Sequence, residues 1–311
     1  MFNKVLAATA RPLACDESVL SASRIAQHDN AKLLILHVLV SDSSIYRNYV
    51  KHLRTGEEIV SGEAYPEEVK EEFYEKCSGG LKSRNEFEIR IVLGVPWMEI
   101  LRCAREEKVD LIVLGAHAGK ADSEERGGTG RTVGSTAEGV IKHERCPVMI
   151  VNNPMPESKV TFEKIMVSID FSPSCISAFQ FAVELAQKQG SKLYLFHMLP
   201  VPPQPEYSQT QYETDIRKVK QRLEAEFCNK IPGTIETEID TWGGVYPDME
   251  ILKSARQNDV DLIAMGSHTK IKGKLEESRW YVGSAVERVS TMAFCPVAVI
   301  TDPNVLQKWE C

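Results

Sequence analysis

The sequence predicts an α/β protein built from two similar domains in tandem, each with a parallel sheet and helices on both faces. Two observations support this prediction. Residues 109–117 recur as residues 260–268, and further matched segments keep the same order in both halves of the 311-residue chain. In each half, short apolar runs alternate with amphipathic stretches, which is the pattern of parallel strands joined by crossover helices.

The duplication extends along the whole chain. Residues 98–101 recur as residues 249–252, and both halves then carry a Gly-Ser pair and a Cys-Pro-Val triplet, which begin at Gly134, Cys146, Gly283 and Cys295. Near the start of each half, Lys4 matches Lys164, and His37 matches His197. So many matches in one order indicate a repeat of one unit.

Five strands are expected in each half, at residues 4–8, 32–40, 89–93, 111–115 and 148–151, and again at 164–169, 192–199, 235–239, 262–266 and 297–300. The first helix of each half is expected to begin after an N-cap at Asp16 or Ser174. Residues 152–158 contain Asn and Pro and predict a linker, so the domains are expected at 1–152 and 160–303.

The composition excludes several classes of function. A formal net charge of −7 argues against a large nucleic-acid surface, which needs a basic excess. No apolar run approaches the roughly 20 residues that cross a bilayer, and residues 1–10 have the pattern of a strand instead of a signal peptide. The eight cysteines include no CxxC pair and have no histidine at metal-ligand spacing. We therefore expect a cytoplasmic protein with no metal, membrane or nucleic-acid partner.

Ligands of open α/β sheets bind at the carboxyl ends of the strands, where the strand order reverses. In each half, a glycine ends the fourth strand, and the next helix is predicted to begin at a Gly-Ser pair. Backbone N–H groups at a helix N-terminus favour phosphate. The same glycines would also suit any tight connection, so this pattern leaves both interpretations open. His37 and His197 are expected to be structural, hydrogen-bonded histidines.

The segments 266–268, 283–289 and 295–297 together resemble the universal stress protein family, and the resemblance covers the whole chain as two domains. It implies a Rossmann-like, five-stranded parallel sheet in each half, a cytoplasmic location and a role in stress adaptation. It also implies dimer-type association through the last strand. A tandem chain can satisfy that association internally, as a pseudo-dimer of its own halves, and a homodimer remains a second option.

Some members of this family bind ATP through the glycine motif. The resemblance therefore implies nucleotide contacts at Asp170, Met198, Gly266, His268, Gly283 and Ser284 in the second half, and at Val38, Gly115, His117, Gly119, Gly134, Ser135 and Thr136 in the first. Neither motif is intact. Ala118 and Thr269 occupy the second glycine position, the loops that follow are longer than in the family, and Ala10 is the counterpart of Asp170.

Two functions follow as alternatives. One is a non-enzymatic stress-response protein regulated by an adenine nucleotide, ATP above all, in one or both pockets. The other is a protein-interaction module that binds unknown protein partners through the long loops 118–133 and 269–282 without nucleotide. Phosphoryl transfer is not expected, because no Gly-Lys-Ser/Thr loop is present.

Overall fold

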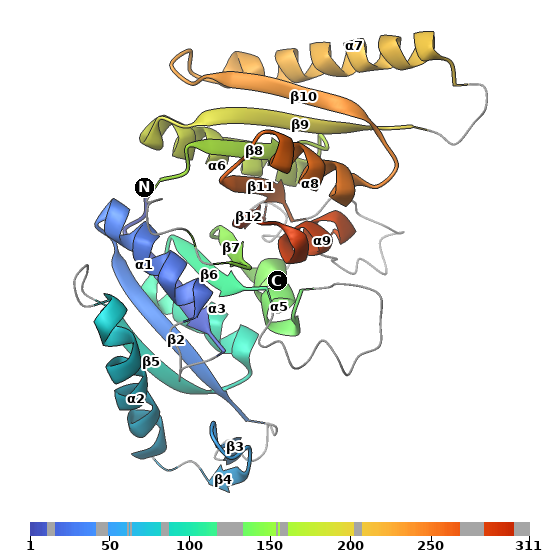
Figure 1. Cartoon of the computed structure of the whole chain (residues 1–311). Helices are drawn as coiled ribbons and strands as arrows, with labels where there is room; N and C mark the ends of the chain where they lie inside the picture. Colours follow the sequence, from blue (N-terminus) through green and yellow to red (C-terminus); the bar gives the residue numbers. More distant parts are fainter. Residues whose placement is uncertain are drawn as a thin grey trace, which may run out of the picture. The chain divides into compact units, whose positions relative to one another are not determined.

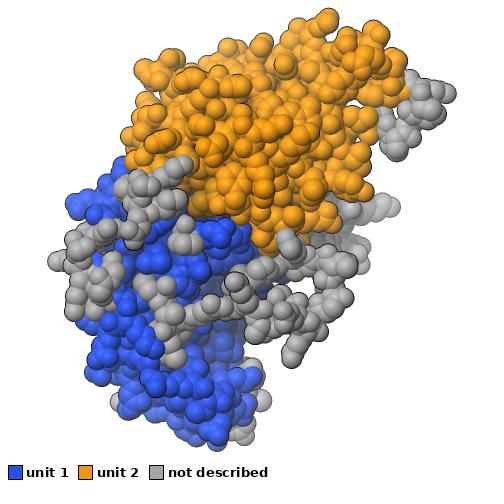
Figure 2. All heavy atoms as spheres, viewed as in Figure 1, with its two compact units in different colours: residues 1–160 blue, residues 161–311 orange. Residues whose placement is uncertain are grey.

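The computed structural model describes residues 1–10, 16–41, 49–60, 62, 64–81, 87–116, 133–153, 155, 161–201, 207–267 and 283–301, without the side chains of residues 78–80. The chain divides into two compact units (Figure 2). Unit 1 comprises Met1–Val160 and unit 2 comprises Thr161–Cys311.

Unit 1 contains a parallel sheet in the order β7-β6-β1-β2-β5. Its strands are β1 (Lys4–Thr9), β2 (Lys32–Val40), β5 (Phe87–Gly94), β6 (Leu111–Gly115) and β7 (Val148–Val151). Its helices are α1 (Glu17–Asp29), α2 (Ala64–Leu81), α3 (Pro96–Glu107) and α5 (Ser135–His143) (Figure 1). Seven consecutive residues of β2 are buried, so both faces of the sheet are covered.

Unit 2 repeats this arrangement in the order β10-β9-β8-β11-β12. The strands are β8 (Lys164–Ser168), β9 (Lys192–Pro200), β10 (Thr237–Gly244), β11 (Leu262–Gly266) and β12 (Val297–Ile300). The helices are α6 (Pro173–Gln189), α7 (Gln209–Glu226), α8 (Pro247–Gln257) and α9 (Ser284–Met292), with a 3-10 turn, η1 (Cys228–Lys230). In both units the third, second, first, fourth and fifth strands follow one another across the sheet, which confirms the predicted doubly wound α/β repeat.

Three details differ from the sequence predictions. The N-cap of α6 is Ser172, whose hydroxyl accepts the Cys175 N–H at 3.2 Å, and the prediction of Ser174 was wrong. The reason is Pro173, which suits the first helical position, so the cap falls at Ser172, two residues before the predicted one. The predicted cap at Asp16 is confirmed. Residue 235 precedes β10 instead of lying in it.

The third difference is an antiparallel hairpin in unit 1, formed by β3 (Tyr49–Lys51) and β4 (Glu58–Val60). The strands predicted for the first half leave residues 41–88 without one. Each strand has three residues, which is too short for a period-two pattern to identify. The hairpin lies next to α2, where Arg54 forms an ion pair with Glu72 at 2.6 Å.

Candidate functional site

The strand order places a switch point between the first and fourth strands of each unit, which are β1 and β6 in unit 1 and β8 and β11 in unit 2. The carboxyl ends of these strands are where ligands of such sheets bind. In unit 2, Asp170 follows β8, Met198 lies in β9, Gly266 ends β11 and Gly283 precedes α9. The predicted residues of unit 2 that the structure describes thus belong to elements that meet at this edge.

Asp170 is exposed just beyond the end of β8. Its Oδ1 accepts the backbone N–H of Ser172 at 3.0 Å, which closes a short turn before α6. The next residue, Phe171, has a left-handed φ of 62°. This local turn fixes the carboxylate at the strand end, where it can accept hydrogen bonds from a ligand.

His197 in β9 is also held at this edge. Its Nδ1 donates to the carbonyl oxygen of Ile169 at 2.7 Å, because a carbonyl can only accept. The ring of Phe171 lies 4.9 Å from the His197 ring, and the Arg222 guanidinium lies 3.7 Å over Phe171. Burial is the main cause that lowers the pKa of His197 below its usual value; the bond to Ile169 and the charge of Asp170 act in the opposite direction, and the charge of Arg222 adds a smaller lowering effect. The structural role predicted for His197 is confirmed.

Gly266 has a packing role in the structure. A Cβ at this position would lie 2.5 Å from the carbonyl carbon of Ser174 and 2.6 Å from the nitrogen of Cys175. Both atoms belong to the backbone of α6, which cannot give way as a flexible side chain does. The glycine therefore lets α6 approach the end of β11, and this role accounts for the residue without any ligand.

Gly283 is the N-cap of α9 and has no side chain that could cap the helix. Its own N–H donates to the carbonyl of Ser267 at 3.2 Å. Ser267 is buried, and its hydroxyl accepts a hydrogen bond from Thr301 at 2.8 Å, which holds Ser267 directly after β11. The first turn of α9, with Ser284 exposed, presents backbone N–H groups of the kind that bind anions.

Unit 1 has a different set of groups at the end of β1. Ala10, the counterpart of Asp170, is exposed and has no carboxylate. A carboxylate that contacts the end of β1 is that of Asp16, which accepts hydrogen bonds from Thr9 Oγ1 at 2.5 Å, Ser18 Oγ at 2.6 Å and the Val19 N–H at 3.1 Å. The sequence identified Asp16 only as a helix cap. Its oxygens are already used inside the protein, so it does not replace Asp170.

His37 is the counterpart of His197 and is only 4% exposed. Its Nδ1 donates to the Thr9 carbonyl at 2.8 Å, which confirms its predicted structural role. This bond leaves Nε2 as a bare acceptor, and among the described residues Nε2 has no partner. Burial lowers the pKa of His37, so the ring is neutral at pH 7.

The remaining predicted residues of unit 1 occupy matching positions. Val38 is buried in β2 opposite Val92 of β5, and Gly115 ends β6. Gly134 is the N-cap of α5 and donates its N–H to Ala116 at 3.0 Å, and Ser135 and Thr136 form the first turn. His117, Gly119 and His268, together with the loops 118–132 and 269–282, lie outside the described residues.

Within the described segments, no helix is long and apolar enough to span a membrane. The same segments contain no group of three or more His, Cys, Asp or Glu side chains that could hold a metal ion. Fold and strand ends together thus define a tandem Rossmann-like protein with two unequal candidate sites.

The universal stress protein family model matches residues 1–152 and 161–301. The chain therefore belongs to the universal stress protein family, with two domains of that family in tandem. The universal stress protein MJ0531 of Methanocaldococcus jannaschii is 38% identical over 101 residues, and MJ0577 of the same organism is 41% identical over 61 residues. These matches cover 31% and 20% of this chain, and only 56% and 34% of the two relatives.

Solved structures share the fold over nearly the whole chain. A universal stress protein from Archaeoglobus fulgidus DSM 4304 has a TM-score of 0.62 at 20% identity, with 96% of each chain covered. A putative universal stress protein from Pseudomonas aeruginosa UCBPP-PA14 also has a TM-score of 0.62, at 13% identity, with 99% of this chain and 96% of the other covered.

Proposed function

We propose that this chain is a non-enzymatic stress-response protein that binds an adenine nucleotide at the strand ends of unit 2. The observation that carries the proposal is the fixed, exposed carboxylate of Asp170 at the switch point of the sheet. In unit 1, the corresponding residue is Ala10, and the nearby Asp16 carboxylate is already bonded within the protein.

The chemistry of the edge suits the two ends of a nucleotide. A carboxylate can accept hydrogen bonds from ribose hydroxyls, which is a role for Asp170. The N-terminus of α9 behind Gly283 offers backbone N–H groups and partial positive charge to phosphates. Met198 lies near the carboxyl end of β9, where its half-buried side chain provides apolar surface.

We propose binding without turnover. Phosphoryl transfer in nucleotide hydrolases uses a lysine that reaches the phosphates from a Gly-Lys-Ser/Thr loop, and this sequence has no such loop. ATP would then act as a regulatory ligand. Release of phosphate by the full chain, lost on replacement of Asp170, would contradict this part of the proposal.

The binding part is tested by calorimetric titration of the full chain with ATP, AMP and adenosine, for the wild type and Asp170→Asn. The amide keeps the shape of the side chain and can still accept the Ser172 N–H, but it removes the charge. We expect binding by the wild type and about tenfold weaker binding by the variant, equivalent to loss of a charge-assisted hydrogen bond of about 1.4 kcal/mol.

The matched control is Asp259→Asn. Asp259 is also an exposed aspartate of unit 2, but it precedes β11 and thus lies at the amino ends of the strands. Asparagine tolerates its left-handed φ of 50°. Equal weakening by both variants would contradict a site at Asp170. Absence of binding to wild-type protein at millimolar nucleotide would leave the interaction module as the function.

A further inference from the structure

A groove runs along β5, the terminal strand of the unit 1 sheet. It has a volume of about 710 Å³ and is lined by the six consecutive residues 87–92 of β5 and by five residues of α2, namely Glu67, Lys70, Glu71, Tyr74 and Glu75. Neighbouring residues of a strand point to opposite faces of the sheet. Because residues of both faces line the groove, it follows the outer edge of β5.

Within the described part of the chain, the backbone of this edge is available for pairing. Among the described residues, β5 pairs only with β2. The Ser41 N–H donates to the Gly94 carbonyl at 3.4 Å, so the peptide groups of Gly94 face β2. Since these groups alternate in direction along a strand, those of Ile89 and Ile91 face outward. An edge of this kind is a template for another strand.

The helix wall of the groove is acidic. Glu67, Glu71 and Glu75 are spaced by four residues and therefore share one face of α2. Over its whole length, α2 has five glutamates and two lysines, a net charge of −3. The corresponding helix of unit 2, α7, has four acidic and four basic residues, a net charge of zero. The acidic wall is thus a property of unit 1.

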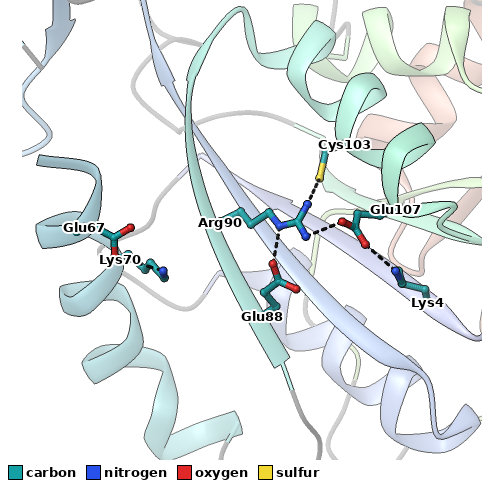
Figure 3. Close-up of polar contacts among 7 residues, drawn as sticks. All are labelled: Lys4, Glu67, Lys70, Glu88, Arg90, Cys103 and Glu107. Carbon is teal, nitrogen blue, oxygen red and sulfur yellow. Dashed lines mark hydrogen bonds and ion pairs between the residues drawn. The ribbon is translucent and has the colours of Figure 1, made fainter. Parts of the chain in front are cut away.

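The basic residues at the groove are already paired. Lys70 contacts Glu67 at 3.3 Å. Arg90 bonds to Glu88 at 2.5 Å and to Glu107 at 2.6 Å, and Glu107 in turn contacts Lys4 at 2.7 Å. Figure 3 shows the Arg90 guanidinium directed away from Glu67 and Lys70, toward Glu107 and Cys103. Four carboxylates against two basic groups line the groove, so its net charge is −2.

We propose that this edge groove binds an extended, lysine- or arginine-rich segment of a partner protein, which adds to β5 as a further strand. Main-chain bonds to the outer edge of β5 would supply affinity, and the carboxylates of α2 would select basic side chains. Helix α2 covers the face of Phe87, since the rings of Tyr74 and Phe87 lie 5.6 Å apart. The half-buried Val92 lies on the opposite face and offers apolar contact to the alternate side chains there. A second copy of this chain is disfavoured, since pairing β5 with β5 would bring two acidic walls together.

This site is independent of the nucleotide site proposed for unit 2. It can be tested on the full chain by fluorescence anisotropy with a labelled, capped hexapeptide Lys-Val-Lys-Val-Lys-Val. We expect binding that weakens about tenfold for Glu71→Lys, because one groove charge is reversed. The matched control Glu224→Lys makes the same change at an exposed position of α7 and should bind as the wild type does.

Two further probes test the mode of binding. The same hexapeptide with every backbone nitrogen methylated keeps its charge but cannot donate to β5, and it should lose binding. Hydrogen exchange should show that the bound peptide protects the amides of Ile89 and Ile91. Nucleotide titration of Glu71→Lys should match the wild type, which separates this proposal from the one for unit 2.

The opposite results would overturn the proposal. They are equal binding of Glu-Val-Glu-Val-Glu-Val, equal binding of the methylated peptide, or unchanged affinity in Glu71→Lys. Sedimentation that shows a dimer strengthened by Glu71→Lys would assign the groove to a second copy of the chain instead.

Discussion

The guanidinium of Arg222 on α7 lies 3.7 Å from the centre of the Phe171 ring, directly over the turn that follows β8. Phe171 in turn contacts His197, so a charge on α7 is coupled to a titratable group at the strand ends. The corresponding histidine of unit 1, His37, is only 4% exposed, and the unit 1 counterpart of Phe171 lies outside the described residues.

Replacement of Arg222 by Ala should raise the pKa of His197. The nearby positive charge disfavours the imidazolium, in addition to the burial that is the main cause of the lowered pKa of His197. An NMR titration of the His197 ring protons measures the change. Arg217→Ala, which removes an exposed arginine of the same helix, is the control and should leave the titration unchanged. A pKa of His197 that is the same in Arg222→Ala and in the wild type would contradict the coupling.

His37 should make unit 1 less stable in mild acid. Its folded-state pKa is lowered, so the unfolded chain binds the proton first. The stability that the neutral ring contributes is present above the unfolded pKa of about 6.5 and is lost as the pH falls below it. Exclusion of this proton from the folded state costs up to about 1.4 kcal/mol between pH 7.5 and 5.5.

Urea unfolding at the two pH values, for the wild type and His37→Gln, checks this prediction. The variant should show a smaller loss of unfolding free energy on acidification. His197→Gln is informative as a second variant, because its pKa is shifted in the same direction. The same pH dependence in His37→Gln and the wild type would show that His37 is not responsible.

Gly266→Ala should destabilise unit 2 by about 1–3 kcal/mol, the usual effect of an inserted methyl group in a tightly packed contact. The new Cβ would overlap the α6 backbone at Ser174 and Cys175. Gly233→Ala is the control, since no atom lies within 4 Å of a Cβ at that position and its φ is not positive. Thermal unfolding of both variants compares them, and equal melting temperatures would contradict the close approach.

Gly283→Asp should separate stability from anion binding. An aspartate N-cap stabilises a helix relative to glycine, by about 0.5 kcal/mol with the helix dipole included, so the melting temperature should rise. The same carboxylate repels phosphates, so ATP should bind more weakly while adenosine binding is retained. Calorimetry compares the variant with Gly134→Asp, its counterpart on α5. Unchanged ATP affinity in Gly283→Asp would place the phosphates elsewhere.

Much of the fold could be predicted from the sequence. The fourth and fifth strands of both units begin and end where the apolar runs do, because a strand buried on both faces is a continuous apolar segment. The Ser172 cap and the β3–β4 hairpin could not be predicted in this way. A two-residue difference at a helix start and three-residue strands depend on local backbone geometry that periodicity does not record.

For the candidate sites, the sequence identified individual positions but not their neighbours. Asp170 followed from the family resemblance, and its counterpart without a carboxylate, Ala10, followed from the repeat. The hydrogen bonds of Asp16 to Thr9 and Ser18, and the position of Arg222 over Phe171, required the three-dimensional structure. The acidic groove between α2 and β5 is a similar case. Its two walls are separate segments of the sequence, and the sequence pattern does not show that they lie side by side.

The sequence by itself determined that this protein is a duplicated α/β unit, because strand and helix patterns are local and the unit occurs twice in the chain. Its motifs also identified the universal stress protein family. The tertiary structure decided what each copy presents at its strand ends and edges. Burial, pairing and charge there depend on which distant side chains pack together, as Arg222 does on Phe171 and Arg90 does between Glu88 and Glu107. Two copies of one pattern have thereby become two chemically distinct units.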